Sequence, residues 1–241
     1  MVSQAIGVVY IVFIVVTSFF FFTGALILWV FTVLVDRRLI LLHLYSSFWA
    51  TVYVWVMPAW QVSYQGKENI GKKTYIVVSN HQSLVDILVI FGLFFPFKWV
   101  SKAEAFKLPF IGWNMRLNRY VAIKRGHRGS ISELMKETEA HLRRGSSVFF
   151  FPEGTRSKNG ELRLFKLGAF ALAKKLQVPV LPIVIDGTIN ALPKHSLRFH
   201  GKHNIIIKVL PEISPEHFEV MNENELAECA RNMINDNMPS R

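Results

Sequence analysis

The sequence predicts an α/β protein with a mostly parallel central sheet flanked by helices, preceded by an N-terminal hydrophobic helical membrane anchor. Three observations predict it. Two long apolar stretches fill the first 60 residues, short β-rich runs then alternate with helical patterns, and polar clusters follow two of these runs. Alternation of strands and helices is typical of a parallel sheet covered by helices. We therefore expect an anchor in residues 1–62 and an α/β domain in residues 63–241.

The first apolar stretch carries no charged residue over 31 positions, residues 5–35. A helix of that length extends about 46 Å, whereas the hydrocarbon core of a bilayer is about 30 Å thick. The stretch is therefore long enough to cross a membrane with tilt, or to break near Gly24 into two shorter helices.

The second apolar stretch, residues 39–60, follows Asp36, Arg37 and Arg38 and is rich in aromatic residues, which favour the membrane interface. Residues 1–60 contribute a net charge of +1, so +10 of the total of +11 lies in the rest of the chain. Basic segments favour the cytoplasmic side. We therefore expect the second stretch not to cross fully, and the α/β domain to face the cytoplasm.

The strongly basic composition indicates an anionic partner. No helix-turn-helix, zinc-finger or RNA-binding signature is visible, so nucleic acid is not expected. Beside a membrane anchor, an anionic lipid surface is the simpler partner. The single cysteine, Cys229, excludes an intrachain disulfide and lacks the neighbours of a zinc site.

Hydrophobic periodicity gives the expected elements of the α/β domain. Strands are predicted at residues 74–79, 98–101, 119–124, 147–151, 180–185 and 204–210. Helices are predicted at residues 83–94, 110–117, 130–144, 165–176 and 224–235.

Two polar clusters follow predicted strands directly. Residues 80–86 follow the first strand, and residues 152–157 follow the fourth. Ligands of open α/β sheets bind outside the carboxyl ends of the strands. These two clusters are therefore the candidate site.

The first cluster pairs His81 with Asp86. If a helix begins at Ser83, the carboxylate lies in its first turn and can reach back to one imidazole nitrogen. It would fix the tautomer while the other nitrogen takes a proton from a hydroxyl. The alternative is structural, because Ser83 and Asp86 also resemble a capping box and His81 can be an ordinary loop residue.

The second cluster turns at Gly154 between Glu153 and Arg156. A guanidinium there can bind a phosphate bidentately. Because Glu153 would repel a phosphate, its carboxylate is expected to bind a substrate hydroxyl or to orient a basic neighbour. The alternative is a surface turn with an ordinary Glu–Arg ion pair.

Together these residues resemble the glycerolipid acyltransferase family that includes 1-acylglycerol-3-phosphate acyltransferases. Four segments, in order, carry the resemblance over residues 74–186. They are Asn80-His81-x-Ser83-x-x-Asp86, then Lys102-x-Glu104 with Pro109, Gly112 and Arg125, then residues 151–157 continuing to Gly168, and the proline-bearing run at residues 178–183.

The resemblance implies transfer of a fatty acyl group from acyl-CoA or acyl carrier protein to the hydroxyl of lysophosphatidic acid, giving phosphatidic acid, without a bound cofactor or metal. His81 would be the base and Asp86 its support. The acceptor site would comprise Arg125, Glu153, Gly154, Thr155, Arg156 and Lys102.

Other readings stay open. Another lysophospholipid, a lyso-aminolipid or glycerol 3-phosphate can serve as the acceptor of the same reaction. A non-catalytic membrane protein that binds anionic lipid is an alternative from a different class. A lipid hydrolase is a third, although no G-x-S-x-G nucleophile elbow is present.

Overall fold

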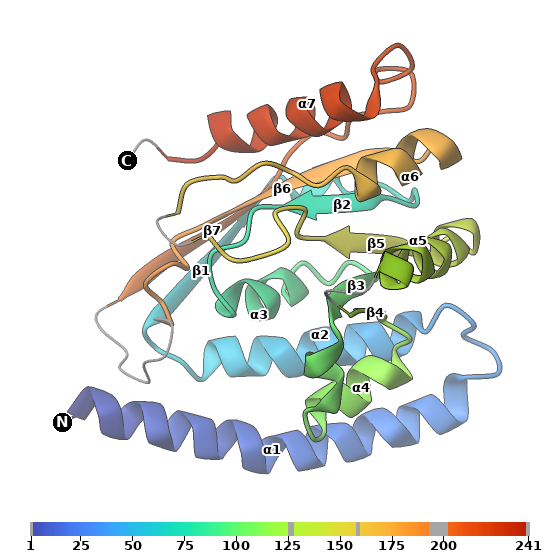
Figure 1. The fold of residues 1–241 in the computed structure, drawn as a ribbon. Coiled ribbons are helices and arrows are strands. Elements are labelled where there is room, and N and C mark those ends of the chain that lie inside the picture. Colours follow the sequence, from blue (N-terminus) through green and yellow to red (C-terminus); the bar gives the residue numbers. More distant parts are fainter. Residues whose placement is uncertain (1, 125–127, 158–159, 193–201, 240–241) are drawn as a thin grey trace.

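The computed structural model describes residues 2–124, 128–157, 160–192 and 202–239 (Figure 1). It is an α/β structure, which confirms the predicted fold class. The strands are β1 Trp60–Gln65, β2 Ile76–Ser79, β3 Phe97–Lys102, β4 Val121–Ile123, β5 Ser147–Phe150, β6 Val180–Asp186 and β7 His203–Val209. The helices are α1 Val2–Thr32, α2 Ile40–Trp55, α3 Val85–Phe91, α4 Ile111–Leu117, α5 Arg128–Arg143, α6 Gly168–Leu176 and α7 Glu223–Asp236, with 3-10 turns η1 Lys67–Asn69 and η2 Ala103–Lys107.

The strands form one sheet in the order β1-β7-β6-β2-β5-β3-β4. Within the described residues, every neighbouring pair is parallel except β6 and β7. Strands β2, β5 and β6 lie side by side at the centre and point the same way, as Figure 1 shows. The segments that follow β2 and β5 therefore meet at one edge, which brings the two polar clusters together.

All six strands expected from periodicity overlap observed strands, but β1 was not predicted. Its residues, Trp60–Gln65, lie where the aromatic second stretch gives way to polar residues, and they pair in parallel with β7 from Trp60–His203 to Gln65–Lys208. The sheet thus begins within the segment assigned to the anchor, and β1 lies across the expected boundary between residues 62 and 63.

The sheet separates two apolar cores, one on each face. Along β2, Val77 packs into the core shared with α2 and α3, whereas Ile76 and Val78 pack into the core shared with α6 and α7. This is the two-residue alternation of a strand buried on both faces. Figure 1 shows α1, α2 and α3 on one side of the sheet and α6 and α7 on the other.

Helices α1 and α2 form an antiparallel hairpin that lies against the α/β domain. Helix α1 runs unbroken through Gly24, so the expected alternative of two shorter helices does not occur. The Tyr10 hydroxyl donates to the Tyr53 carbonyl oxygen at 2.7 Å, and Phe22 contacts Trp113 of α4 with ring centroids 5.5 Å apart. Residues 7–32 are the one segment of the described chain that is long and apolar enough to cross a membrane by length and composition.

Candidate active site

The imidazole of His81 and the carboxylate of Asp86 are directly hydrogen-bonded, with Nδ1 and Oδ2 2.7 Å apart. The same oxygen accepts the backbone N–H groups of Gln82 at 2.7 Å and Ser83 at 2.9 Å. An oxygen that accepts two backbone N–H groups has no proton of its own to donate. The proton of the contact with His81 therefore belongs to Nδ1. In the neutral imidazole with its proton on Nδ1, Nε2 is the nitrogen that can take a proton.

Asp86 makes the contacts that both interpretations of it expect. Its Oδ2 satisfies backbone donors at the start of α3, as a capping residue does, and also holds the imidazole. The helix begins at Val85, two residues later than the expected start at Ser83. Asp86 is fully buried, so this arrangement is shielded from water.

The ring of His81 is stacked on the ring of Phe151, with centroids 3.9 Å apart and an interplanar angle of 12°. The imidazole thus has an aromatic plate on one face and Asp86 at one edge. Its side chain is 14% exposed, and His81 lines the large cavity described below. The ring is therefore fixed in orientation while remaining accessible from the cavity.

Glu153 is buried and holds the two polar clusters together. Its Oε1 accepts the backbone N–H of His81 at 2.9 Å, and its Oε2 accepts that of Arg163 at 3.1 Å. Burial raises the pKa of this carboxyl above its ordinary value, and the two amide hydrogen bonds act in the opposite direction. Glu153 is not among the residues that line the cavity, which differs from the expected contact with a substrate hydroxyl.

Further backbone contacts fix the same edge. The N–H of Ser157 donates to the His81 carbonyl oxygen at 2.8 Å. The side-chain amide of Asn80 accepts the backbone N–H of Ile185 on β6 at 2.8 Å and donates to the carbonyl oxygen of Ile185 at 2.7 Å. Gly154 has φ +71°, a left-handed conformation that favours glycine. A Cβ at this position would lie 2.8 Å from the Lys166 Nζ, which is the end of a flexible side chain, so the left-handed backbone is the reason that favours glycine here.

A cavity of about 1380 Å³ opens beside His81. It exceeds the roughly 300–1,000 Å³ usual for small-molecule pockets. Three basic residues, Lys102, Arg156 and Lys166, line it together with the acidic residue Glu104. The remainder is mostly apolar and is lined by Trp49 and Tyr53 of α2, together with Leu84, Leu88, Trp99, Leu108, Ile111, Met115, Ile123, Ile131, Leu134 and Met135.

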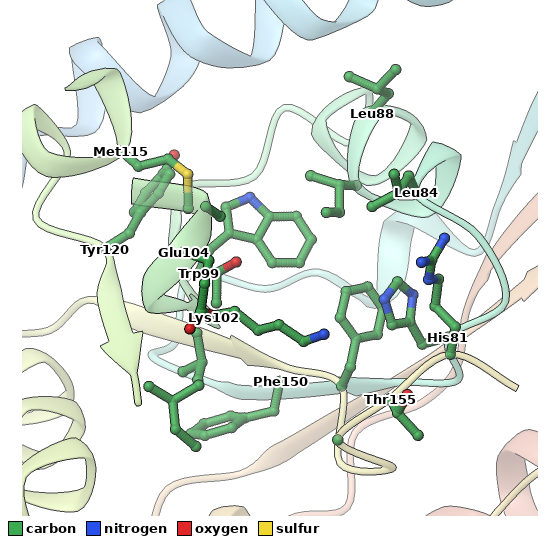
Figure 2. A pocket seen from close by; sticks show the side chains of 18 of the residues that line it. His81, Leu84, Leu88, Trp99, Lys102, Glu104, Met115, Tyr120, Phe150 and Thr155 are labelled. Atoms are coloured by element: carbon green, nitrogen blue, oxygen red, sulfur yellow. The ribbon is translucent and has the colours of Figure 1, made fainter. Parts of the chain in front are cut away.

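Figure 2 shows how the labelled side chains lie in this cavity. Lys102, from the end of β3, extends across the cavity toward His81, while Thr155 lies close to His81 in the turn after β5. Leu84 and Leu88 on the α3 side, and Trp99 and Met115 on the other, form apolar walls. A charged group and an apolar chain can therefore occupy neighbouring parts of one cavity.

The structure brings most of the predicted site residues together. His81, Lys102, Gly154, Thr155 and Arg156 all line the cavity. Asp86 and Glu153 support them from behind, through the hydrogen bonds given above. Arg125 lies outside the described residues.

Sequence reasoning missed several residues of the cavity. Lys166 belongs to the third motif, and a basic residue within that motif was the available signal. Ile14 and Ser46, which come from the α1–α2 hairpin, line the cavity as well. No spacing within the sequence relates them to His81, because only the tertiary packing of the hairpin brings them there.

The comparisons with known proteins agree with this geometry. Residues 61–186, 126 of the 241 residues, match the family model described as Acyltransferase. A chloroplastic 1-acyl-sn-glycerol-3-phosphate acyltransferase of Brassica napus is 39% identical over 182 residues, which is 73% of this chain and 52% of that protein. A 1-acyl-sn-glycerol-3-phosphate acyltransferase of Saccharomyces cerevisiae is 34% identical over 188 residues, 76% of this chain and 61% of that one.

A solved structure is similar throughout. The 1-acyl-sn-glycerophosphate acyltransferase of Thermotoga maritima superposes with a TM-score of 0.77 at 27% identity, covering 100% of this chain and 99% of that one. The chain spans about half the length of its chloroplastic relatives from Brassica napus and Arabidopsis thaliana. The matched region contains both polar clusters and the strands that carry them, and on this basis the chain belongs to the acyltransferase family.

Proposed function

We propose that the protein transfers a fatty acyl chain from an acyl-CoA or acyl carrier protein thioester to the free hydroxyl of lysophosphatidic acid, giving phosphatidic acid. The observation that carries this proposal is the His81–Asp86 pair at a cavity whose mostly apolar wall includes three basic side chains. The names of the relatives in plants, yeast and Thermotoga support it.

His81 acts as the general base in this proposal. Its Nε2 accepts the proton of the acceptor hydroxyl as the oxygen attacks the thioester carbonyl carbon. The carbon–sulfur bond then breaks, and the imidazolium returns the proton to the departing thiolate. Asp86 stabilises the imidazolium through the 2.7 Å contact with Nδ1 and keeps the ring in the productive tautomer.

Cationic side chains bind the phosphate of the acceptor in this proposal. Arg156 and Lys102 line the same cavity as His81, and Lys166 lies beside Gly154. Guanidinium and ammonium groups pair strongly with phosphate oxygens. Glu153 acts as a positioning residue, because both of its oxygens hold backbone amides of the loops that carry His81 and Arg163.

The apolar part of the cavity receives an acyl chain. Trp49 and Tyr53 come from α2, whereas Leu88 comes from α3 and Leu84 directly precedes it, so the acyl chain would lie between the hairpin and the catalytic domain. Each buried methylene contributes about 0.8 kcal/mol. Withdrawing a long chain into water is therefore costly, and a cavity reached from the bilayer avoids that cost.

Helix α1 attaches the domain to the membrane and lies along its surface. Between residues 8 and 32 its outward face is mostly apolar, with Val9 68%, Phe20 66% and Phe31 80% exposed. Its inward face is held against the domain at Tyr10 and at Phe22. A helix held in this way would bury its outward face in one leaflet, with the catalytic domain and the hairpin turn both facing the cytoplasm.

The proposed activity is tested with the purified protein, labelled acyl-CoA or acyl carrier protein thioester, and a panel of acceptors. We expect lysophosphatidic acid to give phosphatidic acid faster than lysophosphatidylcholine or glycerol 3-phosphate gives its product, as measured by chromatography of the lipids. Release of free fatty acid without an acceptor would identify a hydrolase instead. Absence of any product with both donors would favour a non-catalytic lipid-binding protein.

A variant of the proposed phosphate site sharpens this assay. Arg156→Ala is expected to raise KM for lysophosphatidic acid about 10- to 100-fold, the equivalent of one lost hydrogen bond to a charged group. Arg143→Ala is the matched control, because Arg143 is an exposed residue of α5 bonded to Glu139. An unchanged KM in Arg156→Ala would reject phosphate binding at that residue.

The proposed membrane arrangement predicts that the hairpin turn and the catalytic domain share one side. Two single-cysteine variants test it, Cys229→Ser/Arg37→Cys for the turn and Cys229→Ser/Glu228→Cys for exposed Glu228 on α7. An impermeant maleimide added to inverted and right-side-out vesicles should label both in the inverted vesicles only. Labelling of the two positions from opposite sides would mean that α2 crosses the bilayer.

A further inference from the structure

A second cavity, of about 190 Å³, lies at the opposite end of the sheet from His81. It is bounded by the turn of the α1–α2 hairpin and by the segments that lead into β2, β3 and β5. His81 and the Gly154 turn follow the carboxyl ends of β2 and β5, whereas this cavity lies at their amino ends. The two cavities are therefore separated by the length of the strands.

The wall of this cavity is strongly basic. Arg38, Lys72, Lys73 and Lys98 line it, and none of its lining residues in the described chain is a carboxylate. Lys73 pairs with Glu212, outside the wall, at 2.5 Å. The carboxylate of Asp36 is close by but accepts the backbone N–H of Leu41 at 2.7 Å, at the start of α2. The remaining cationic charge favours an anion in the cavity.

Lys98 places a buried ammonium in the same wall. The residue is 3% exposed, and its Nζ donates to the carbonyl oxygens of Arg38 at 2.8 Å and Asn118 at 2.9 Å. Burial lowers its pKa to about 8. In the described part of the chain no ion pair joins Lys98 to a carboxylate. An anion bound beside it would supply the countercharge that a buried ammonium otherwise lacks.

The basic cavity adjoins an apolar tip. At the end of α1 and in the following turn, Phe31 is 80%, Leu34 is 86% and Val35 is 81% exposed. Arg38 follows within a few residues, and its Nη1 is held by the Gly145 carbonyl oxygen at 2.9 Å. Exposed apolar side chains next to a basic hollow match a phospholipid, with its tails on the tip and its phosphate in the hollow.

We propose that this second cavity binds the phosphate-bearing headgroup of an anionic phospholipid and so selects anionic membranes for the enzyme. The inference rests on the membrane attachment proposed above and is independent of acyl transfer. A free phosphate ion offers the same chemistry, but it lacks the tails for which Phe31, Leu34 and Val35 provide a surface.

The test measures co-sedimentation of the full chain with vesicles of phosphatidylcholine alone and of phosphatidylcholine with phosphatidylglycerol. Each basic residue near an anionic surface contributes about fivefold in affinity, so Arg38→Gln/Lys72→Gln should bind the anionic vesicles about 25-fold more weakly than wild type. Binding to neutral vesicles should not change. Lys136→Gln/Lys202→Gln is the control, with the same loss of charge at exposed positions outside the cavity.

An equal loss in the control variant would attribute the effect to net charge and overturn the site. Unchanged binding of Arg38→Gln/Lys72→Gln, or of the milder Lys72→Gln in case the double variant fails to fold, would also overturn it. Titration of inorganic phosphate without lipid separates the two sources. Phosphate binding that the double variant abolishes, with vesicle binding intact, would replace the lipid by a soluble anion.

The same proteins separate this inference from the proposed activity. In detergent micelles, acyl transfer by Arg38→Gln/Lys72→Gln should match wild type, because neither residue lines the cavity at His81. If the wild type transfers no acyl group, yet binds anionic vesicles more tightly than the variant does, the proposed activity is wrong and the lipid site stands. A wild type that binds no vesicle would remove the membrane attachment and this site together.

Discussion

Replacement of His81 by alanine is expected to abolish measurable acyl transfer. General base catalysis contributes a factor of about 10² to 10⁴ to the rate. The Nε2 of His81 is the proposed base, because Asp86 holds the other ring nitrogen and the residue lines the cavity. Alanine cannot accept the hydroxyl proton, and no other imidazole lines this cavity in the described chain. The measurement is steady-state phosphatidic acid formation at saturating donor and acceptor.

The protein should still fold and reach the membrane after this change. Asp86 keeps its bonds to the backbone N–H groups of Gln82 and Ser83, so the start of α3 is preserved. His217→Ala, at an exposed position outside the cavity, is the matched control and should retain full activity. Near-normal transfer by a folded His81→Ala protein would reject the proposed role of the dyad.

The alternating part of the fold was predictable from local patterns. Residues 76–79 and 147–150 are buried along their whole length, as expected of central strands in a parallel sheet. The runs that form these strands are short, apolar and bounded by polar clusters. Their secondary structure and their order along the chain could therefore be predicted. The expected meeting of the two clusters follows from parallel strands and is confirmed by the contact between Glu153 and the His81 amide.

The first strand was not predictable from the same patterns. Strand β1 pairs with β7, about 140 residues later in the chain, and this distant pairing is not visible in local patterns. Trp60 at its start completes an aromatic run that continues from α2, and Tyr10 of α1 packs on Trp60 with ring centroids 5.8 Å apart. The local composition therefore predicted that the membrane segment includes the start of β1, whereas pairing with β7 makes β1 an edge strand of the sheet.

The residues of the candidate site could be predicted from the sequence, but the contacts that each residue makes could not. The sequence offered a capping role or a catalytic role for Asp86, and the structure assigns both contacts to one oxygen. Glu153 was expected to face the substrate, yet its two oxygens each accept a backbone amide. Such assignments depend on where neighbouring backbone N–H groups point, which residue type and spacing do not specify.

Substitution of Asp86 by asparagine has the second largest expected effect, because it removes the charge while keeping an acceptor oxygen. That oxygen can still accept from His81 and from the two backbone amides. The imidazolium that forms during transfer loses its countercharge, and we expect kcat to fall about 100-fold or more with little change in KM. A role limited to capping α3 would leave kcat nearly unchanged in the folded variant.

The stability of this variant distinguishes the two contributions. The introduced amide nitrogen would occupy the place of Oδ1, which is buried and has no hydrogen-bond partner among the described residues. An unsatisfied buried donor costs about 1–3 kcal/mol, so the unfolding temperature should fall modestly while the protein remains folded at assay temperature. The loss of rate would then exceed what partial unfolding can explain.

The double variant His81→Ala/Asp86→Asn decides whether the two side chains act as one unit. If Asp86 contributes to catalysis only through His81, the double variant should be no slower than His81→Ala alone, because groups that act together are strongly non-additive. A rate lower by the product of the two single effects would show that the carboxylate reaches the reacting atoms by another route. Since Asp86 is fully buried and its contact to the cavity runs through the imidazole, we expect the non-additive result.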